Sequence, residues 1–184
     1  MPIRWGWKLS ARESKTQRIV VGFGSNIRPA ENLPRALQLL KARVPVVALS
    51  RVWEGPPVGA NGPHFYNAAA VVLAPFSAAR LKEAVLRPIE AALGRVRTAN
   101  PNAPRPIDLD ILVEGSQVID ADVWRYAYWA VPVAEIAPGL RHPTTGQPLA
   151  AIARKTARTT PLRHVALAAW TLASPPDDER PPHP

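Results

Sequence analysis

The chain has 184 residues, a length that suits one domain with a single core, and 47% of its residues are hydrophobic. It contains no cysteine, which excludes disulfides and thiolate metal sites and is typical of a cytoplasmic protein. The net charge of +9 is concentrated at the ends, where residues 1–18 carry five Lys/Arg against one acid. We therefore expect no nucleic-acid partner. We also expect no membrane association, because no apolar run could span a bilayer and no signal peptide is recognised.

The two ends of the chain differ in composition from its middle. Residues 1–18 are polar and basic with no clear period, and we interpret them as an N-terminal extension. Residues 156–184 are interpreted as a C-terminal extension, whose last eleven residues include five prolines and are expected to be disordered. The folded domain is therefore expected over residues 19–155.

Segments with strand and helix periodicity alternate between these ends. In chain order we expect a strand at 18–24, a helix at 32–43, strands at 46–54 and 65–74, a helix at 77–93, a strand at 107–115 and a short helix at 149–156. Ser77 is a suitable N-cap for the second helix, and Gly94 a suitable stop. The order of the first six elements is the split βαβ arrangement, which predicts a mainly antiparallel sheet with helices on one face.

Two aspartates lie two residues apart inside the apolar strand at 107–115. Because successive side chains of a strand point to opposite faces, Asp108 and Asp110 share one face, roughly 7 Å apart. Neighbouring carboxylates repel and raise each other's pKa unless cations lie between them. A pair of Mg²⁺ ions shared with phosphate oxygens would keep both carboxylates ionised. On the spacing alone, a solvated polar face on an edge strand is the simpler alternative.

Three arginines flank the aspartates in the sequence. Arg105 precedes Asp108 by three residues, while Arg95 and Arg97 follow the helix at 77–93. Guanidinium groups bind phosphate through paired hydrogen bonds, whereas one structural salt bridge would need only one arginine. Metal ions and arginines converging on one cleft predict a phosphoryl-transfer site, where positioning and charge neutralisation perform the catalysis.

Six short motifs occur in a fixed order along the expected domain. They are GFGSN at 22–26, GPPVG at 55–59, FYNAA at 65–69, EAALGRVR at 90–97, PRPIDLDIL at 104–112 and VPVAEIAP at 131–138. Together they resemble the 6-hydroxymethyl-7,8-dihydropterin pyrophosphokinase family, whose members transfer diphosphate from ATP to a pterin in folate synthesis. The resemblance implies a ferredoxin-like α/β (α+β) fold, two Mg²⁺ ions, and ATP and a reduced pterin as small-molecule substrates.

The resemblance implies roles for the residues on the nucleotide side. Asp108 and Asp110 would bind the two Mg²⁺ ions, and Arg95 and Arg105 would hold the ATP phosphates during transfer. These four residues are the expected catalytic set. Additional nucleotide contacts are expected from three further residues, namely Arg97, Ile111 and Arg125.

On the pterin side, the family sandwiches the ring between two aromatic side chains. Phe65 and Tyr128 match those positions, and Asn67 matches the amide that hydrogen-bonds the edge of the pterin. The loop wall beneath the ring would consist of Gly55, Pro56 and Val58. The implied reaction is attack of the pterin hydroxymethyl oxygen on the β-phosphorus of ATP, with AMP as the leaving group.

Two departures from the family lie on the nucleotide side. Asn102 stands where members usually have a Trp, and the segment after the aspartate strand is several residues shorter and lacks a phosphate-contacting His. Trp124 and Arg125 lie near this gap. Losing one charged phosphate contact costs about 2–3 kcal/mol, which slows an enzyme about 30–150-fold without abolishing it. A catalytically weak or inactive pterin-binding module is therefore the alternative, and a ferredoxin-like nucleic-acid binder ranks last; the oligomeric state is not predicted.

Overall fold

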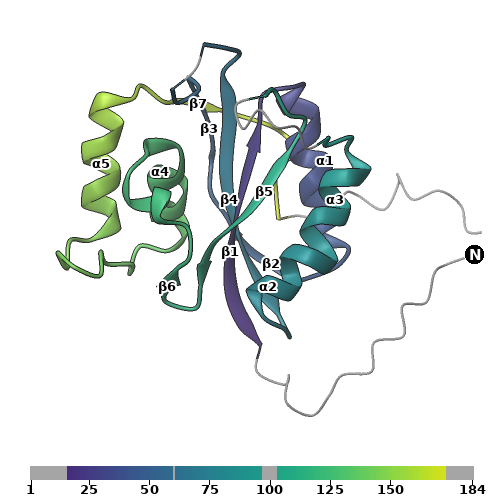
Figure 1. Ribbon diagram of the computed structural model, residues 1–184, viewed down its shortest axis with the longest axis horizontal. Helices are drawn as coiled ribbons and strands as arrows, with labels where there is room; N and C mark the ends of the chain where they lie inside the picture. The colour runs from purple at the N-terminus through teal and green to yellow at the C-terminus, as the bar shows by residue number, and fades with distance from the viewer. Residues whose placement is uncertain (1–15, 60, 97–102, 173–184) are drawn as a thin grey trace, which may run out of the picture.

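A twisted antiparallel sheet lies between two layers of helices in the computed structural model, which describes residues 16–59, 61–96 and 103–172 (Figure 1). The strands are β1 Gln17–Ser25, β2 Val46–Leu49, β3 Val52–Gly55, β4 Phe65–Ala74, β5 Asp108–Glu114, β6 Gln117–Val118 and β7 Arg163–Val165. Their order across the sheet is β6-β5-β1-β4-β3-β7, with β2 also paired to β4. The long strands β1 and β4 are therefore central, and β5 lies beside β1.

Two sets of helices cover the two faces of this sheet. One layer contains α1 Pro29–Lys41, α2 Ala78–Leu81, the π-helical segment η1 Lys82–Leu86 and α3 Arg87–Ala92. The other contains the 3₁₀ segment η2 Ala121–Trp124, α4 Ala127–Ile136 and α5 Leu149–Thr159. No helix within the described ranges has the length and apolar character that a membrane crossing requires.

The predicted elements are present, with differences that have physical causes. The strand expected at 46–54 is divided into β2 and β3, because the chain leaves the regular pairing at Ser50 and Arg51. The helix expected at 77–93 begins with Ser77 as N-cap and ends before Gly94, whose φ of 82° suits glycine, but it contains the π turn of η1.

The prediction of helices on one face only is wrong, because α4 packs on the second face and α5 packs against α4. The segment AYWAVPVAEI of α4 is apolar on nearly every side and includes Pro132, so it carries no amphipathic period that would reveal a helix. Strand β7 is a further element that the sequence does not predict. It lies in the segment expected as a C-terminal extension, and it pairs with β3. Residues 1–15 and the proline-rich end lie outside the described residues.

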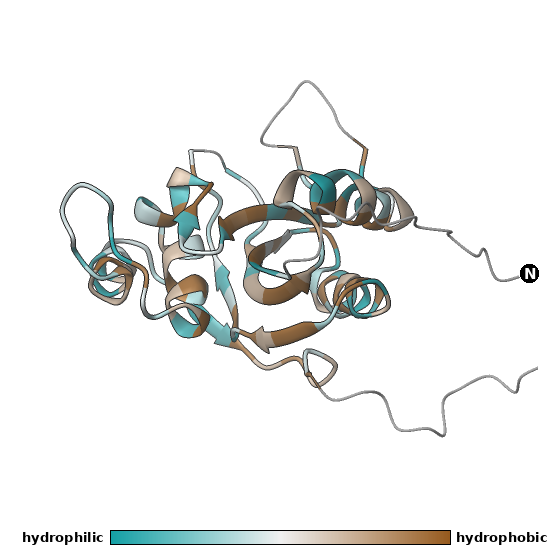
Figure 2. Cartoon of the chain, turned by 90° about the horizontal axis from the view of Figure 1, so that it is seen from below, coloured by the Kyte–Doolittle hydropathy of each residue, from teal (hydrophilic) through white to brown (hydrophobic). Residues whose placement is uncertain are grey.

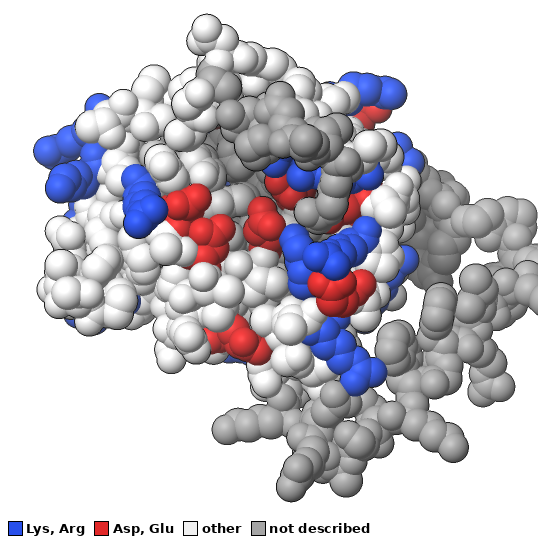
Figure 3. All heavy atoms as spheres, viewed as in Figure 1, with Lys and Arg blue, Asp and Glu red and all other residues white. Residues whose placement is uncertain are grey.

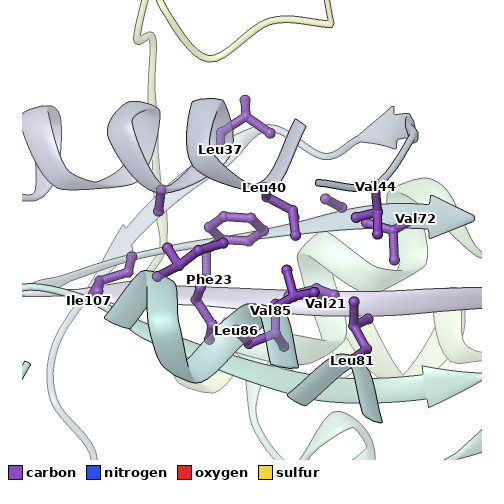
Figure 4. Packing of buried hydrophobic residues seen from close by; sticks show 14 of the residues in the cluster. Val21, Phe23, Leu37, Leu40, Val44, Val72, Leu81, Val85, Leu86 and Ile107 are labelled. Atoms are coloured by element: carbon purple, nitrogen blue, oxygen red, sulfur yellow. The ribbon is translucent and has the colours of Figure 1, made fainter. Parts of the chain in front are cut away.

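The larger core lies between the sheet and the α1–α3 layer. Phe23 of β1 is fully buried there among the leucines of α1 and η1, including Leu37, Leu40 and Leu86 (Figure 4). In Figure 2 the apolar colouring is concentrated on the central strands between the helices. Burial of each such side chain contributes about 1.5–3 kcal/mol, so this layer fixes β1 and β5 in place.

The second core lies on the opposite face, under α4 and α5, and it depends on a missing side chain. A Cβ at Gly22 of β1 would lie 2.7 Å from Cη2 of Trp129 and 2.8 Å from Cδ1 of Leu112. Such separations are too short for any real Cβ, so glycine at this position allows Trp129 of α4 to lie directly on the strand. This contact sets how closely α4 approaches the sheet.

The substitution Gly22→Ala is expected to lower the free energy of unfolding by about 1–3 kcal/mol, because Trp129 or Leu112 must leave its place to admit the methyl group. Urea denaturation followed by tryptophan fluorescence measures this change. Gly139→Ala is the matched control, because a Cβ there meets nothing within 4 Å. Equal stability of the Gly22→Ala variant and wild type would show that α4 adjusts freely.

Candidate active site

The two aspartates of β5 face the α4 side of the sheet. Asp108 pairs with Gly24 and Asp110 with Gly22 of β1, while Leu109 between them is fully buried in the larger core. The side chain of Asp108 is 19% exposed and that of Asp110 is 38% exposed. The two carboxylates therefore share one partly covered face, as the strand period predicts, and they do not lie on an open solvated surface.

A row of residues across three strands links the aspartates to the pterin-side residues. Asn67 of β4 pairs with Gly24 of β1, which in turn pairs with Asp108 of β5. A Cβ at Gly24 would lie 3.2 Å from Nδ2 of Asn67 and 3.9 Å from Cβ of Asp108. Because glycine leaves this position empty, the amide and the carboxylate border the same open strip.

Arginine side chains surround Asp108 from two loops. Nη1 of Arg105 lies 2.7 Å from Oδ2, and Nη2 of Arg95 lies 3.3 Å from Oδ1. The side chain of Arg95 is only 11% exposed, and its Nε and Nη1 have no hydrogen-bond partner among the residues that the structure describes. Buried donors without acceptors are costly, so this guanidinium group is arranged to receive an anionic oxygen.

Asp110 has a different cationic partner, Lys82 of η1. Nζ of Lys82 lies 3.0 Å from Oδ1 of Asp110 and also donates to the carbonyl of Leu109. The buried Glu90 of α3 accepts a hydrogen bond from the N–H of Leu109 at 2.9 Å, and its Oε1 lies 4.0 Å from Nζ of Lys82. Burial and the charge of Asp108 raise the pKa of Asp110, and Lys82 opposes that shift.

A cavity of about 320 Å³ opens beside the row of residues. Five of the six residues expected on the pterin side line it, namely Pro56, Val58, Phe65, Asn67 and Tyr128. Arg105 also lines the cavity, with its guanidinium carbon 5.9 Å from the centre of the Phe65 ring. A cavity of this size accommodates a small bicyclic ring, and Arg105 joins it to the aspartates.

Tyr128 reaches the cavity from α4. Its ring stacks on that of Tyr126 with centres 5.3 Å apart and lies next to Trp129, the residue that contacts Gly22. Burial raises the pKa of Tyr128, and nearby acidic groups add to the shift, so its hydroxyl stays neutral at physiological pH. The tyrosine therefore offers a flat, uncharged wall to the cavity.

On the side of the molecule seen in Figure 3, acidic side chains gather across the middle, with basic side chains close beside them.

The described residues that were predicted for the site and remain to be placed lie outside the cavity. Gly55 pairs with Phe65 within the sheet, Ile111 packs against the larger core, and Arg125 is exposed at the end of η2. Arg97 and Asn102 lie outside the described residues.

Sequence reasoning assigned no role to Asn26, although it lies in the GFGSN motif. Its Oδ1 accepts a hydrogen bond from the N–H of Arg105 at 2.7 Å, and its own N–H donates to the Arg105 carbonyl at 3.2 Å. The hydroxyl of Ser25 donates to the carbonyl of Pro106 at 2.6 Å. These hydrogen bonds hold the loop that carries Arg105 against the end of β1. Lys82 was missed entirely, because no local pattern relates it to β5.

The fold and the site together define an α/β protein in which a ring-sized cavity adjoins a cluster of arginines and aspartates. Residues 20–138 match the family described as 7,8-dihydro-6-hydroxymethylpterin-pyrophosphokinase (HPPK). The chain belongs to this family.

Similar proteins support this assignment. A Pseudomonas aeruginosa protein named 2-amino-4-hydroxy-6-hydroxymethyldihydropteridine pyrophosphokinase is 34% identical over 140 residues, which cover 69% of this chain and 85% of the relative. A Methylorubrum extorquens protein with the same name is 41% identical over 135 residues, covering 67% and 84%. The Plasmodium falciparum HPPK-DHPS crystal structure with pteroate has the same fold, with a TM-score of 0.63 at 14% identity. That match covers 80% of this chain, which spans 43% of the solved chain.

The substitution Asp120→Asn is expected to stabilise the protein at pH 7. Asp120 caps η2 by accepting from the N–H of Asp122 at 2.9 Å, and asparagine retains that function. Burial raises the pKa of Asp120, so its charged form destabilises the folded state above that pKa. The advantage of the variant should shrink as the pH falls and disappear below about 3.9, where the wild-type carboxyl becomes protonated in both states. Urea midpoints measured across this range test the sign; a variant less stable at pH 7 would contradict it.

Proposed function

We propose that the protein transfers the diphosphate group of ATP to the hydroxymethyl group of 6-hydroxymethyl-7,8-dihydropterin, releasing AMP, in the synthesis of folate or a related pterin cofactor. The observation that carries this proposal is that Nε and Nη1 of Arg95, beside Asp108, are buried without a hydrogen-bond partner among the described residues, while Arg105, the other arginine on Asp108, lines a cavity sized for the ring. Membership of the pyrophosphokinase family supports the same reaction. The absence of cysteine is in keeping with a cytoplasmic location.

The aspartates fit Mg²⁺ that arrives with a nucleotide. They supply hard carboxylate oxygens on one face, and no third acidic or histidine side chain in the described part of the chain completes a metal-binding group with them. Mg²⁺ commonly uses one or two carboxylates and takes its other ligands from phosphates and water. Asp108 and Asp110 would hold the two ions, and bound Mg²⁺ would supply neutralisation of the phosphate charge.

The arginines and the cavity residues position the two reactants. The buried guanidinium of Arg95 provides N–H donors for phosphate oxygens, and Arg105 lies between the aspartates and the ring cavity. Phe65 and Tyr128 would flank the pterin while Asn67 hydrogen-bonds its edge. The hydroxymethyl oxygen then forms a bond to the β-phosphorus, the bond from that phosphorus to the α,β-bridging oxygen breaks, and the hydroxyl proton is released to water.

A second candidate is a pterin-binding protein with weak or no transferase activity. The observation in its favour is that Arg125, expected as a nucleotide contact near the shortened segment, is exposed at the end of η2. The two candidates share the ring cavity, and they differ in whether AMP is formed.

Incubation of the protein with ATP, Mg²⁺ and 6-hydroxymethyl-7,8-dihydropterin is expected to release AMP in proportion to the pterin consumed. Arg95→Met should slow this release about 30–150-fold, because a charged phosphate contact is lost. Arg158→Met, an exposed position on α5, is the control and should match wild type. Chromatography of the nucleotides measures the rates. AMP no higher than in a pterin-free blank would favour the second candidate.

The substitution Tyr128→Ala is expected to weaken pterin binding about fivefold to tenfold, because the loss of an aromatic stack costs about 1 kcal/mol or more. Tyr128→Phe retains the ring and should bind like wild type. Titration calorimetry with the pterin measures both dissociation constants. Equal weakening in the two variants would assign the effect to the hydroxyl, and unchanged binding in both would remove Tyr128 from the pterin site.

A further inference from the structure

Lys82 completes a balanced set of charges at the edge of β5. Three buried or partly buried acids lie there, and three cations face them. The acids are Asp108, Asp110 and Glu90, and the cations are Arg95, Arg105 and Lys82. The proposed function uses the arginines and the aspartates, but it gives the lysine no role.

The two aspartates differ in how many of their oxygens are engaged. Both oxygens of Asp108 are held, Oδ1 by Arg95 and Oδ2 by Arg105. Only Oδ1 of Asp110 has a partner, Lys82 at 3.0 Å, and within the described residues no hydrogen bond reaches Oδ2. The side chain of Asp110 is also the more exposed of the two, at 38%. Without Lys82, this carboxylate would have no partner to fix its rotamer.

The π turn of η1 brings Lys82 to the strand edge. The N–H of Arg87 donates to the carbonyl of Lys82, five residues earlier, so this turn holds one residue more than an α-helical turn. Leu86 and Glu90, four and eight residues later, are buried against the core and β5. The wider turn rotates Lys82 relative to them, so its Nζ reaches the Leu109 carbonyl and Asp110. π turns within helices often occur at functional sites.

We propose that Lys82 is a positioning residue for Asp110. By holding Oδ1 of Asp110, the lysine orients the other oxygen, Oδ2, to bind the metal ion. The proposal rests on the proposed function to the extent that Asp110 binds the metal. The lysine is itself held by the Leu109 carbonyl, with Glu90 close by, so it is a fixed anchor. A carboxylate oriented before metal binding loses less conformational freedom when the ion arrives, and such supporting contacts typically change metal affinity about 10–100-fold.

The test is binding of Mn²⁺ alone, measured by electron paramagnetic resonance, to wild type, Lys82→Met, Asp110→Asn and the double variant. Lys82→Met is expected to weaken Mn²⁺ binding about tenfold. In the Asp110→Asn background the same change should have no further effect, because the lysine acts through that carboxylate. Lys82→Arg retains a cation and should restore most of the affinity. Lys155→Met, at an exposed site on α5, is the matched control and should match wild type.

The direction of the change in Mn²⁺ affinity distinguishes a positioning role of Lys82 from a purely electrostatic effect of its charge. Removal of a positive charge alone would tighten the binding of a cation, so equal or tighter Mn²⁺ binding by Lys82→Met overturns the proposal. An equal loss in both backgrounds also overturns it, as does a wild type that binds no Mn²⁺. AMP release by wild type, measured separately, reports on the proposed function. Mn²⁺ coupling without AMP release would leave the role of Lys82 intact and reject the transferase.

Discussion

The architecture depends on two glycines of β1, Gly22, where a Cβ would collide with Trp129, and Gly24, where a Cβ would crowd Asn67. Gly22 admits the ring of Trp129, which seats α4 on the sheet and places Tyr128 at the cavity. Gly24 leaves open the strip between Asn67 and Asp108. The alternate residues of the same strand, among them Phe23, fill the larger core on the other face. The alternation of apolar residues with glycine over residues 21–24 therefore builds a core on one side and a candidate binding site on the other.

The elements of the fold could be predicted wherever the local sequence has the hydrophobic pattern of a strand or a helix. The helix around Leu37 has an amphipathic spacing and the strand 65–74 is a short continuous apolar run, and both elements are present. The helix α4 has no such period, because a segment buried on most sides needs no polar face, and Pro132 further weakens its helical character. Strand β7 has three residues, and its existence is decided by pairing with β3. These two elements depend on tertiary contacts that a sequence pattern does not contain.

In the candidate site too, a contact between residues close in the sequence could be predicted, whereas a contact between distant residues could not. Asp108 and Arg105 are three residues apart, so their meeting follows from the motif itself. The partner of Asp110 is 28 residues away on another element, and it reaches β5 from a π turn that no sequence pattern predicts. Arg125 was assigned by its position near a shortened segment. That segment folds into η2 and exposes the arginine, which a positional argument could not foresee.

The cluster on β5 also explains how so much charge can be held close to a core. Each carboxylate has at least one cation within ion-pair distance, so no acid is left buried and uncompensated before a ligand binds. The remaining imbalance lies on the donor side, in the N–H groups of Arg95 that find no acceptor in the described protein. A phosphate oxygen would satisfy those donors, and a metal ion would take over the carboxylates that the arginines release. Exchange of partners would therefore let the proposed metal–nucleotide complex bind with little net change in buried charge.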